Sequence, residues 1–397
     1  MGILNYIIIF LLVIFPIAEI GKIRFGSITF SLNDILLFSV FLLWIVIDYK
    51  KIKKTKFKLL KPISIFILIG VFSLVVNFLN LKLNEFFVAL LYLLRWVLYA
   101  SFYFILVTRD KEFLNKIKHL LLIPISIVLS LGILQFIYYP SLRNLFYLGW
   151  DEHLYRLFSS FLDPNFAGTF LVISLFYLIY TSWQLFLKKK NNLFVFTSAL
   201  TIINFVSIYL TYSRSALIML LVSLIVFLLL VKKIKILFIL ILVFILLILF
   251  SPKAFQTEGT NIFRVFSSQE RVKSAQIAVN IIEKSLIFGV GFNAYRYAQN
   301  KYANLNDTNW ETTHSGAGTD NSFLFVLATT GILGFAAYLY LIYKMFLLGK
   351  EKLNNPMSII LISVLSGLLI NSLFINSLFY VFILQWVWMF AAFTENN

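Results

Sequence analysis

Three residues in polar segments beside apolar stretches have side chains suited to chemistry: Arg156, Arg214 and Asp320. Arginine stays charged at a membrane boundary, and its planar guanidinium binds two oxygens of a phosphate at once. A carboxylate at the mouth of an apolar segment can accept a proton from a hydroxyl, above all when it is partly desolvated. These residue types suit the binding of a phosphate by arginine and general-base chemistry by a carboxylate.

Each of these residues also has a purely structural interpretation. Asp163-Pro164-Asn165 follows Arg156 and is a typical helix start, with an acidic N-cap and proline in the first turn. Arg214, next to Ser213 between two apolar stretches, could extend to lipid headgroups instead of binding a ligand. Asp320, next to Asn321, could cap the helix that follows.

Two further groups lie in the long polar segment before Asp320. Apolar spacing from Arg271 to Lys284 predicts a short amphipathic helix, with Gly289 as its terminator. The segment Gly289-Val290-Gly291 follows a helix and not a strand, so it indicates a turn and no dinucleotide site. His314 is a second candidate for the base. The chain has three scattered histidines and no cysteine, so we expect no metal site.

The elements that must position these residues are membrane spans. The 397 residues are 61% hydrophobic and only 13% charged, which is typical of a membrane protein. Apolar runs of roughly 17–25 residues recur along the chain. We predict an all-α, polytopic bundle that forms a single membrane domain over residues 1–397. Its spans are about twelve in number: 3–21, 31–49, 63–79, 86–108, 119–139, 166–187, 193–210, 214–231, 235–251, 320–343, 357–373 and 377–393. The last two could also form one long tilted helix.

Basic residues predict the orientation of this bundle. Lysines and arginines gather in the alternate connections 50–61, 109–118, 188–190, 232–235 and 344–352, which we therefore place in the cytoplasm. Both termini are then cytoplasmic, and the long connections 140–165 and 252–319 are extracytoplasmic. The larger one, between the ninth and tenth spans, should contain short helices. The net charge of +17 fits cytoplasmic loops and membrane lipids as partners and does not indicate nucleic-acid binding.

Four groups of residues together resemble the O-antigen ligase and O-antigen polymerase family of bacterial membrane glycosyltransferases. They are an Arg before an Asp-Pro-Asn helix start, a Thr-x-Ser-Arg-Ser-Ala span junction, an Arg-initiated loop helix followed by Gly-x-Gly, and a polar pair before a span with Gly-Ile-x-Gly. Their order along a chain of about twelve spans, with the largest loop outside, is more specific than any one of them. The resemblance covers roughly residues 60–393.

The resemblance implies a reaction at the extracytoplasmic face of the bacterial inner membrane. An oligosaccharide would pass from an undecaprenyl-diphosphate donor to a glycan or lipid-core acceptor, without cofactor or metal, and a chain-length regulator protein would be a possible partner. Arg156 and Arg214 match the role of holding the diphosphate, with contributions from Arg271 and Arg296. Asp163, Asn165, Ser213 and Asn321 would support the site, and Asp320 or His314 would be the base.

One departure from the family favours a polymerase. Ligases commonly carry a His-Asn pair where this chain has Asp320-Asn321. A polymerase of repeat units is therefore the preferred hypothesis, and a ligase is the alternative within the family. A flippase or exporter of lipid-linked oligosaccharides is the alternative from another class, and it would require charged residues along a passage through several spans.

Overall fold

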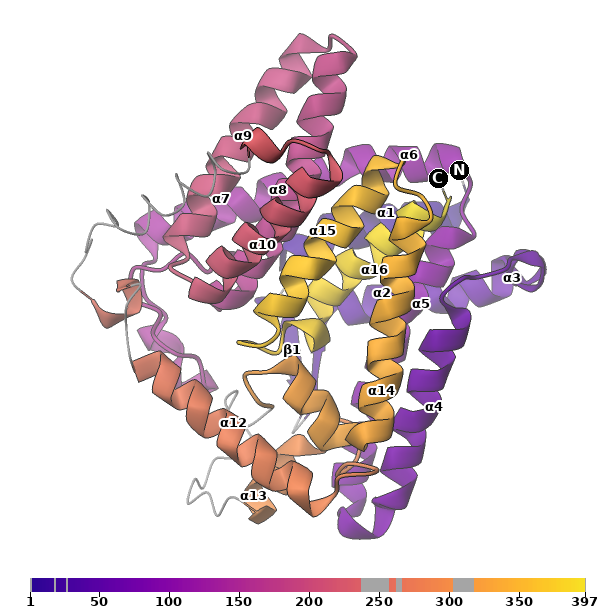
Figure 1. The fold of residues 1–397 in the computed structure, drawn as a ribbon, viewed down its shortest axis with the longest axis vertical. Helices are drawn as coiled ribbons and strands as arrows, with labels where there is room; N and C mark the ends of the chain where they lie inside the picture. Colours follow the sequence, from indigo (N-terminus) through magenta and orange to yellow (C-terminus); the bar gives the residue numbers. More distant parts are fainter. Residues whose placement is uncertain are drawn as a thin grey trace.

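A computed structural model describes residues 2–17, 19–25, 28–236, 257–261, 266–302 and 318–396, and these ranges are mostly helical (Figure 1). The predicted span 235–251 lies almost wholly outside them, as does His314. The helices are α1 (Ile3–Ile14), α2 (Leu32–Ile47), α3 (Tyr49–Lys54), α4 (Leu60–Val76), α5 (Leu83–Val107), α6 (Lys111–Leu120), α7 (Leu122–Tyr138), α8 (Pro164–Leu187), α9 (Asn191–Leu210), α10 (Arg214–Leu230), α12 (Phe266–Lys284), α13 (Tyr295–Tyr302), α14 (Ser322–Lys350), α15 (Pro356–Asn371) and α16 (Val381–Asn396).

A small β-hairpin corrects the all-α prediction. Strands β1 (Lys22–Phe25) and β2 (Ile28–Ser31) pair antiparallel, with Ile23 opposite Phe30. Isoleucine, threonine and phenylalanine favour extended backbone, and the two residues between the strands, 26–27, are Gly-Ser, a typical turn composition. Reading this stretch by hydropathy alone missed that local signal.

Apolar helices long enough to cross a membrane agree with much of the span prediction. Among the described residues, five helical segments have that length and composition, and five shorter apolar helices accompany them. The long ones are Leu83–Val107, Lys111–Tyr138, Pro164–Leu187, Asn191–Leu210 and Ser322–Lys350. Residues 357–393 form two helices, α15 and α16, joined through a 3-10 turn at Ser377–Phe379, so the single long helix is wrong.

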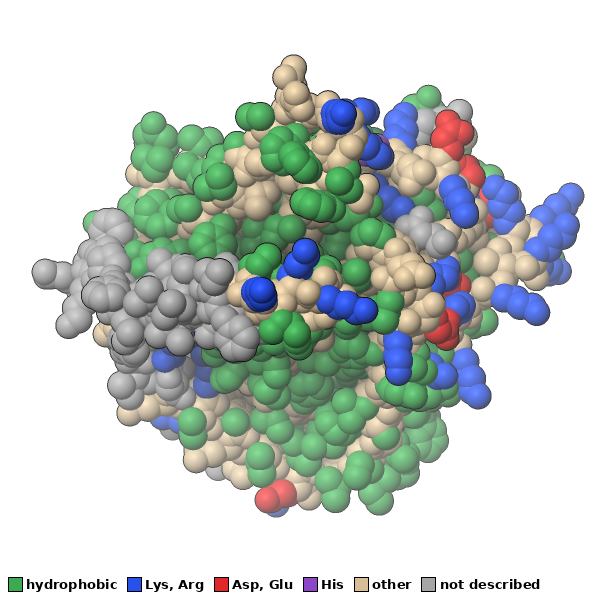
Figure 2. All heavy atoms as spheres, turned by 45° about the horizontal axis from the view of Figure 1, so that its top comes forward, with side chains coloured by type: hydrophobic (Ala, Val, Ile, Leu, Met, Phe, Trp, Pro, Cys, Tyr) green, Lys and Arg blue, Asp and Glu red, His purple; other side chains and the backbone are tan. Residues whose placement is uncertain are grey.

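The surface has the character of a membrane protein. Figure 2 shows hydrophobic side chains over much of the visible face, while lysines and arginines gather toward the side that carries α3 and the chain ends. Contacts at the ends of the helices bring residues near both termini to the same loop after α5. Arg109 donates to Asn5 at 3.4 Å, and Asn396 donates to the Leu106 and Val107 carbonyls at 3.1 and 3.2 Å.

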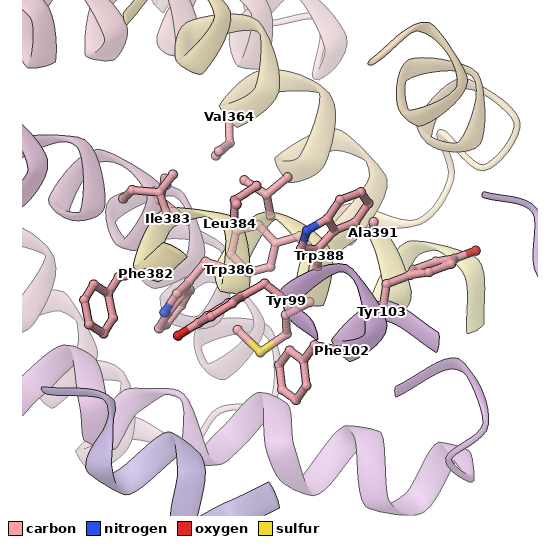
Figure 3. Close-up of a cluster of buried hydrophobic side chains, with 14 of the residues drawn as sticks. Tyr99, Phe102, Tyr103, Val364, Phe382, Ile383, Leu384, Trp386, Trp388 and Ala391 are labelled. Atoms are coloured by element: carbon pink, nitrogen blue, oxygen red, sulfur yellow. The ribbon is translucent and has the colours of Figure 1, made fainter. Parts of the chain in front are cut away.

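Helix α16 forms the centre of the bundle. Its residues from Val381 to Thr394 are all buried, as expected of a helix that is apolar on every side. Trp388 packs edge-on against Trp96 of α5, with ring centroids 6.0 Å apart, and lies near Tyr103 (Figure 3). This aromatic contact fixes α5 to α16.

A buried ion pair fastens α2 to α5. The Arg95 guanidinium donates to both Asp34 oxygens, at 2.9 and 2.7 Å, and the Tyr99 hydroxyl donates to Asp34 at 2.8 Å. Asn33 donates to Tyr99 and to Gln385 of α16, at 2.9 and 2.7 Å. Buried charges in an apolar bundle are tolerated when they compensate each other and their hydrogen bonds are made. A structural role is therefore enough to explain why this ion pair is present.

Candidate functional site

The site begins where α8 and α10 start side by side. Asp163 caps α8 by accepting from the Asn165 and Phe166 amides at 2.6 and 3.4 Å, which confirms the predicted helix start. Ser213 caps α10, and its hydroxyl donates to the Asn165 side-chain oxygen at 2.8 Å. A Cβ on Gly168 would lie 2.6 Å from that of Ala216, so the glycine allows the two helices to approach closely. We call this end of the bundle the site end.

Arg156 connects the first long loop to the start of α10. Its side chain is 6% exposed, and its Nε donates to the Thr211 carbonyl at 2.9 Å. The next amide, Leu157, donates to the Leu210 carbonyl at 2.9 Å. The first and second sequence groups are therefore in direct contact, and Arg156 is a buried residue of the site end.

Asp320 is not the cap of the helix that follows it. Asn321 caps α14 by accepting from the Phe323 and Leu324 amides at 2.9 and 3.0 Å. The Asp320 backbone amide donates to Ser274 of α12 at 3.2 Å, and Ser274 lies 3.1 Å from the Thr319 hydroxyl. The capping interpretation of Asp320 is therefore wrong.

Helix α12 is the Arg-initiated loop helix, the third of the four sequence groups, and it brings Arg271 close to the other three groups. It extends from Phe266 to Lys284, so it contains the predicted Arg271–Lys284 helix and ends at the predicted residue. Arg271 is half-buried, and it is close enough to Asp320, Asp163 and Arg214 for their charges to interact. Residues from four separate parts of the chain thus share one electrostatic environment.

The protein around Asp320 favours its protonated form. Asp320 is exposed as a residue, but the packing around its carboxyl group desolvates it and raises its pKa. Arg271 opposes this rise, whereas Asp163, Asp151 and Glu270 add to it. For Arg271 itself, desolvation lowers the pKa, and Asp320 and Asp163 counteract that change. A carboxylate with a raised pKa is a better proton acceptor than an ordinary aspartate.

Sequence reasoning missed several neighbours of Asp320. Tyr295, the first residue of α13, is 1% exposed and lies close enough to Thr319 and Asp320 for both to influence its pKa, which burial raises. Ser274 and Asp151 are the others. No pattern in the sequence marks them, because only the fold brings them near Asp320. Arg296, beside Tyr295 on α13, is half-buried.

The segment Gly289-Val290-Gly291 is more than the predicted turn. Helix α14 is kinked at Gly331, where φ is 65° and ψ is −170°. The loop segment fits into this kink. Val290 and Gly291 donate to the Ala328 and Thr329 carbonyls at 2.9 and 3.1 Å, and Ile332 donates to the Leu286 carbonyl at 2.9 Å. The loop after α12 is therefore hydrogen-bonded directly to α14, the helix that follows Asp320.

Two side chains at the C-terminal end of α4, Ser73 and the C-cap residue Asn77, stabilise this junction between the loop and α14. The Ser73 hydroxyl lies 2.6 Å from the Phe288 carbonyl and 2.8 Å from the Thr329 carbonyl. The Asn77 amide donates to the Gly289 carbonyl at 2.8 Å. The loop in this junction follows α12, which carries Arg271, and the helix in it, α14, follows Asp320. The junction therefore sets the relative position of Arg271 and Asp320.

We expect Gly331→Ala to impair both stability and function. A Cβ there would lie 2.1 Å from the Ile287 carbonyl oxygen, and alanine disfavours this positive φ by roughly 1–3 kcal/mol even without the clash. The unfolding temperature in detergent and the rate of the reaction should both fall. Gly70→Ala is the matched control, because its Cβ would meet only side-chain atoms, at 3.2 Å, and the change should be mild. Equal behaviour of the two variants would contradict the structural role of the kink.

Helix N-termini and two arginines supply positive charge at the site end, beside the carboxylates of Asp163 and Asp320. The helices α8, α10 and α14 all begin there, and helix N-termini attract negative groups. Arg214 and Arg271 add two full positive charges. Among the described residues, no group of three or more histidine or acidic side chains is placed to hold a metal ion.

The O-antigen ligase family model matches residues 199–339. The matched segment contains Arg214, Arg271 and Asp320, whereas Arg156 and Asp163 precede it. The match confirms the resemblance seen in the sequence and indicates glycan transfer of the ligase and polymerase type by a multi-pass membrane protein. No curated protein matches the chain.

Proposed function

From the family match over residues 199–339, we propose that this protein polymerises undecaprenyl-diphosphate-linked oligosaccharide repeat units at the extracytoplasmic face of the inner membrane. One observation carries the proposal: the Asp320 amide donates to Ser274 at 3.2 Å, one turn of α12 after Arg271, whose charge also acts on Asp163 and Arg214. A cation for the leaving diphosphate and a carboxylate for the attacking hydroxyl are therefore neighbours. The predicted orientation places this site end outside the cytoplasm.

The proposed reaction is a displacement at the anomeric carbon of the donor. Asp320 accepts the proton of an acceptor hydroxyl, whose oxygen forms the new glycosidic bond. The bond between the anomeric carbon and the diphosphate oxygen breaks, and undecaprenyl diphosphate leaves with the electron pair. Arg214 and Arg271 compensate the negative charge that develops on the leaving diphosphate. Such electrostatic stabilisation is usually the largest single contribution to catalysis. Neither a metal nor a cofactor is required by this scheme.

A ligase is the second candidate. The matching family model is described as that of O-antigen ligases, which favours transfer to a lipid core. The aspartate at position 320, where ligases commonly have histidine, favours the polymerase. Both enzymes would use the same donor and differ in the acceptor.

Reconstitution tests the proposed function and separates the candidates. Purified protein in liposomes is supplied with a lipid-diphosphate repeat unit, and the products are separated by length. A polymerase should give a ladder, whereas a ligase should give a single transfer, and only when a lipid-core acceptor is added. Liposomes with Arg214→Ala are the control and should give neither. Absence of any product from the wild-type protein under both conditions would contradict the proposal.

A further inference from the structure

The segment between α15 and α16, residues 372–380, folds around one buried serine at the start of α14. We call this segment the C-terminal connection. The Ser322 amide donates to the Ser372 carbonyl at 2.8 Å. The Ser322 hydroxyl donates to the Ile375 carbonyl at 3.3 Å and accepts from the Leu378 amide at 3.2 Å. Ser322 is 0% exposed, and alanine in its place could make only the first of these three hydrogen bonds.

The C-terminal connection also contacts residues on both sides of Asp320 along the chain. After it, the Asn321 side-chain amide donates to the Leu373 carbonyl at 3.1 Å. Before it, a Cβ on Gly318 would lie 3.3 Å from the side-chain nitrogen of Asn376. The backbone that carries the candidate base is therefore held by this segment as well as by α12.

Helix α15 extends these contacts to the helices that begin at the site end. At its C-terminal end, the Asn371 side-chain oxygen accepts from the Thr169 hydroxyl of α8 at 3.3 Å. Further back, a Cβ on Gly367 would lie 2.6 Å from the Met219 carbonyl oxygen, so α15 packs closely on α10. Since α10 begins at Arg214, α15 and the C-terminal connection link the helix of Arg214 to the loop of Asp320.

We propose that Ser322 is a positioning residue, which fixes Asp320 relative to Arg214 through the C-terminal connection. This inference rests on the proposed function, in which Asp320 is the base and Arg214 binds the diphosphate. Because Ser322 is fully buried, it would act on the substrate only through its neighbour. Accurate placement matters because a displacement of about 1 Å can slow a reaction by about 100-fold.

A double variant tests positioning separately from stability. Ser322→Ala should lower kcat by about tenfold with an unchanged KM for the donor. In an Asp320→Asn background the same change should cause no further loss, because a positioning residue acts only through the group that it positions. Ser363→Ala is the matched control: Ser363 is also 0% exposed, its hydroxyl bonds only within α15, to the Ile359 carbonyl at 2.7 Å, and kcat should stay unchanged.

Asn321→Ser tests the same contact with a smaller change. Serine can still cap α14, so the variant should fold, but it loses the side-chain amide that donates to the Leu373 carbonyl. We expect a fall in kcat of a few-fold, again without further loss in the Asp320→Asn background.

Thiol labelling tests the inference without any turnover. The chain contains no cysteine, so Asp320→Cys introduces the only thiol. Its rate of reaction with a water-soluble maleimide should rise severalfold when Ser322→Ala is added, because the backbone at position 320 is then held less firmly. Adding Ser363→Ala should leave the rate unchanged.

Three results would overturn the inference: an unchanged kcat in Ser322→Ala, a further tenfold loss in the double variant, or equal labelling rates with and without Ser322→Ala. A wild-type protein that forms no product, together with faster labelling in Ser322→Ala, would support the placement of residue 320 by Ser322 and contradict the proposed function alone.

Discussion

Asp320→Asn is expected to lower kcat for glycan transfer by about 10²–10⁴-fold, because an amide cannot accept the proton of the acceptor hydroxyl. The variant should fold normally, since Asn321 and not Asp320 caps α14. Single-turnover kinetics with the lipid-diphosphate donor measures the chemical step. Glu270→Gln is the control: it removes an exposed carboxylate near Asp320 and should leave kcat within a few-fold of the wild type.

The pH profile of the wild-type enzyme should report the raised pKa of Asp320. A general base acts only when deprotonated, so the rate falls as the pH drops through its pKa. Because desolvation and the neighbouring carboxylates raise this pKa, the acid limb should lie above the usual range of an aspartate. Asp163→Asn, which preserves an N-cap residue for α8, should move the limb to lower pH, and Arg271→Gln should move it to higher pH.

A different base would give a different result. Should Asp320→Asn keep nearly full activity with an unchanged acid limb, the role assigned to Asp320 is wrong. His314, which lies outside the described residues, is then the remaining candidate, and the acid limb should disappear in His314→Ala.

Arg271→Ala is expected to lower kcat by about 10²–10³-fold, the usual effect of removing one preorganised donor to a developing negative charge. Arg271→Lys should recover only part of the rate, because an ammonium lacks the fork that binds two phosphate oxygens. Donor analogues with a non-hydrolysable diphosphate should bind more weakly to both variants, as measured by competition. The control is Lys273→Ala, an exposed residue of the same helix whose partner is Glu270, at 2.7 Å.

Loss of activity in Lys273→Ala equal to that in Arg271→Ala would show that α12 contributes only its general positive charge. Unchanged turnover in Arg271→Ala would contradict the proposed handling of the diphosphate.

Sequence predicted the apolar helices well because each long helix carries its own signal in composition and length. The N-cap at Asp163 and the helix ending at Lys284 were predicted for the same reason, since both depend on neighbouring residues. The hairpin at residues 22–31 was missed because hydropathy averaged over the length of a membrane span does not detect strands of only four residues. The assignment of the α14 cap to Asn321 instead of Asp320 needs backbone geometry that composition does not contain.

Contacts between distant segments account for the rest. Residue types suggested that Arg214, Arg271 and Asp320 act together, and the resemblance to a family supplied their order, but nothing in the sequence states that α12 lies beside Thr319. The kink at Gly331 binds Gly289-Val290-Gly291, which belongs to a separate loop. Neither of these two glycine-containing segments therefore indicates, from its sequence, that it contacts the other. Tyr295 and Asp151 become neighbours of Asp320 only through the fold.

The pairing of Asp34 with Arg95 has a consequence for how the protein enters the membrane. The two residues are 61 positions apart, so the ribosome delivers the acidic one to the bilayer long before its counterion exists. Burying a carboxylate without its counterion costs several kcal/mol. The nascent α2 should therefore stay within the insertion machinery until α5 emerges and integrates with it as a unit, and the hydrogen bond from Asn33 to Gln385 then closes only when the last helix has been made.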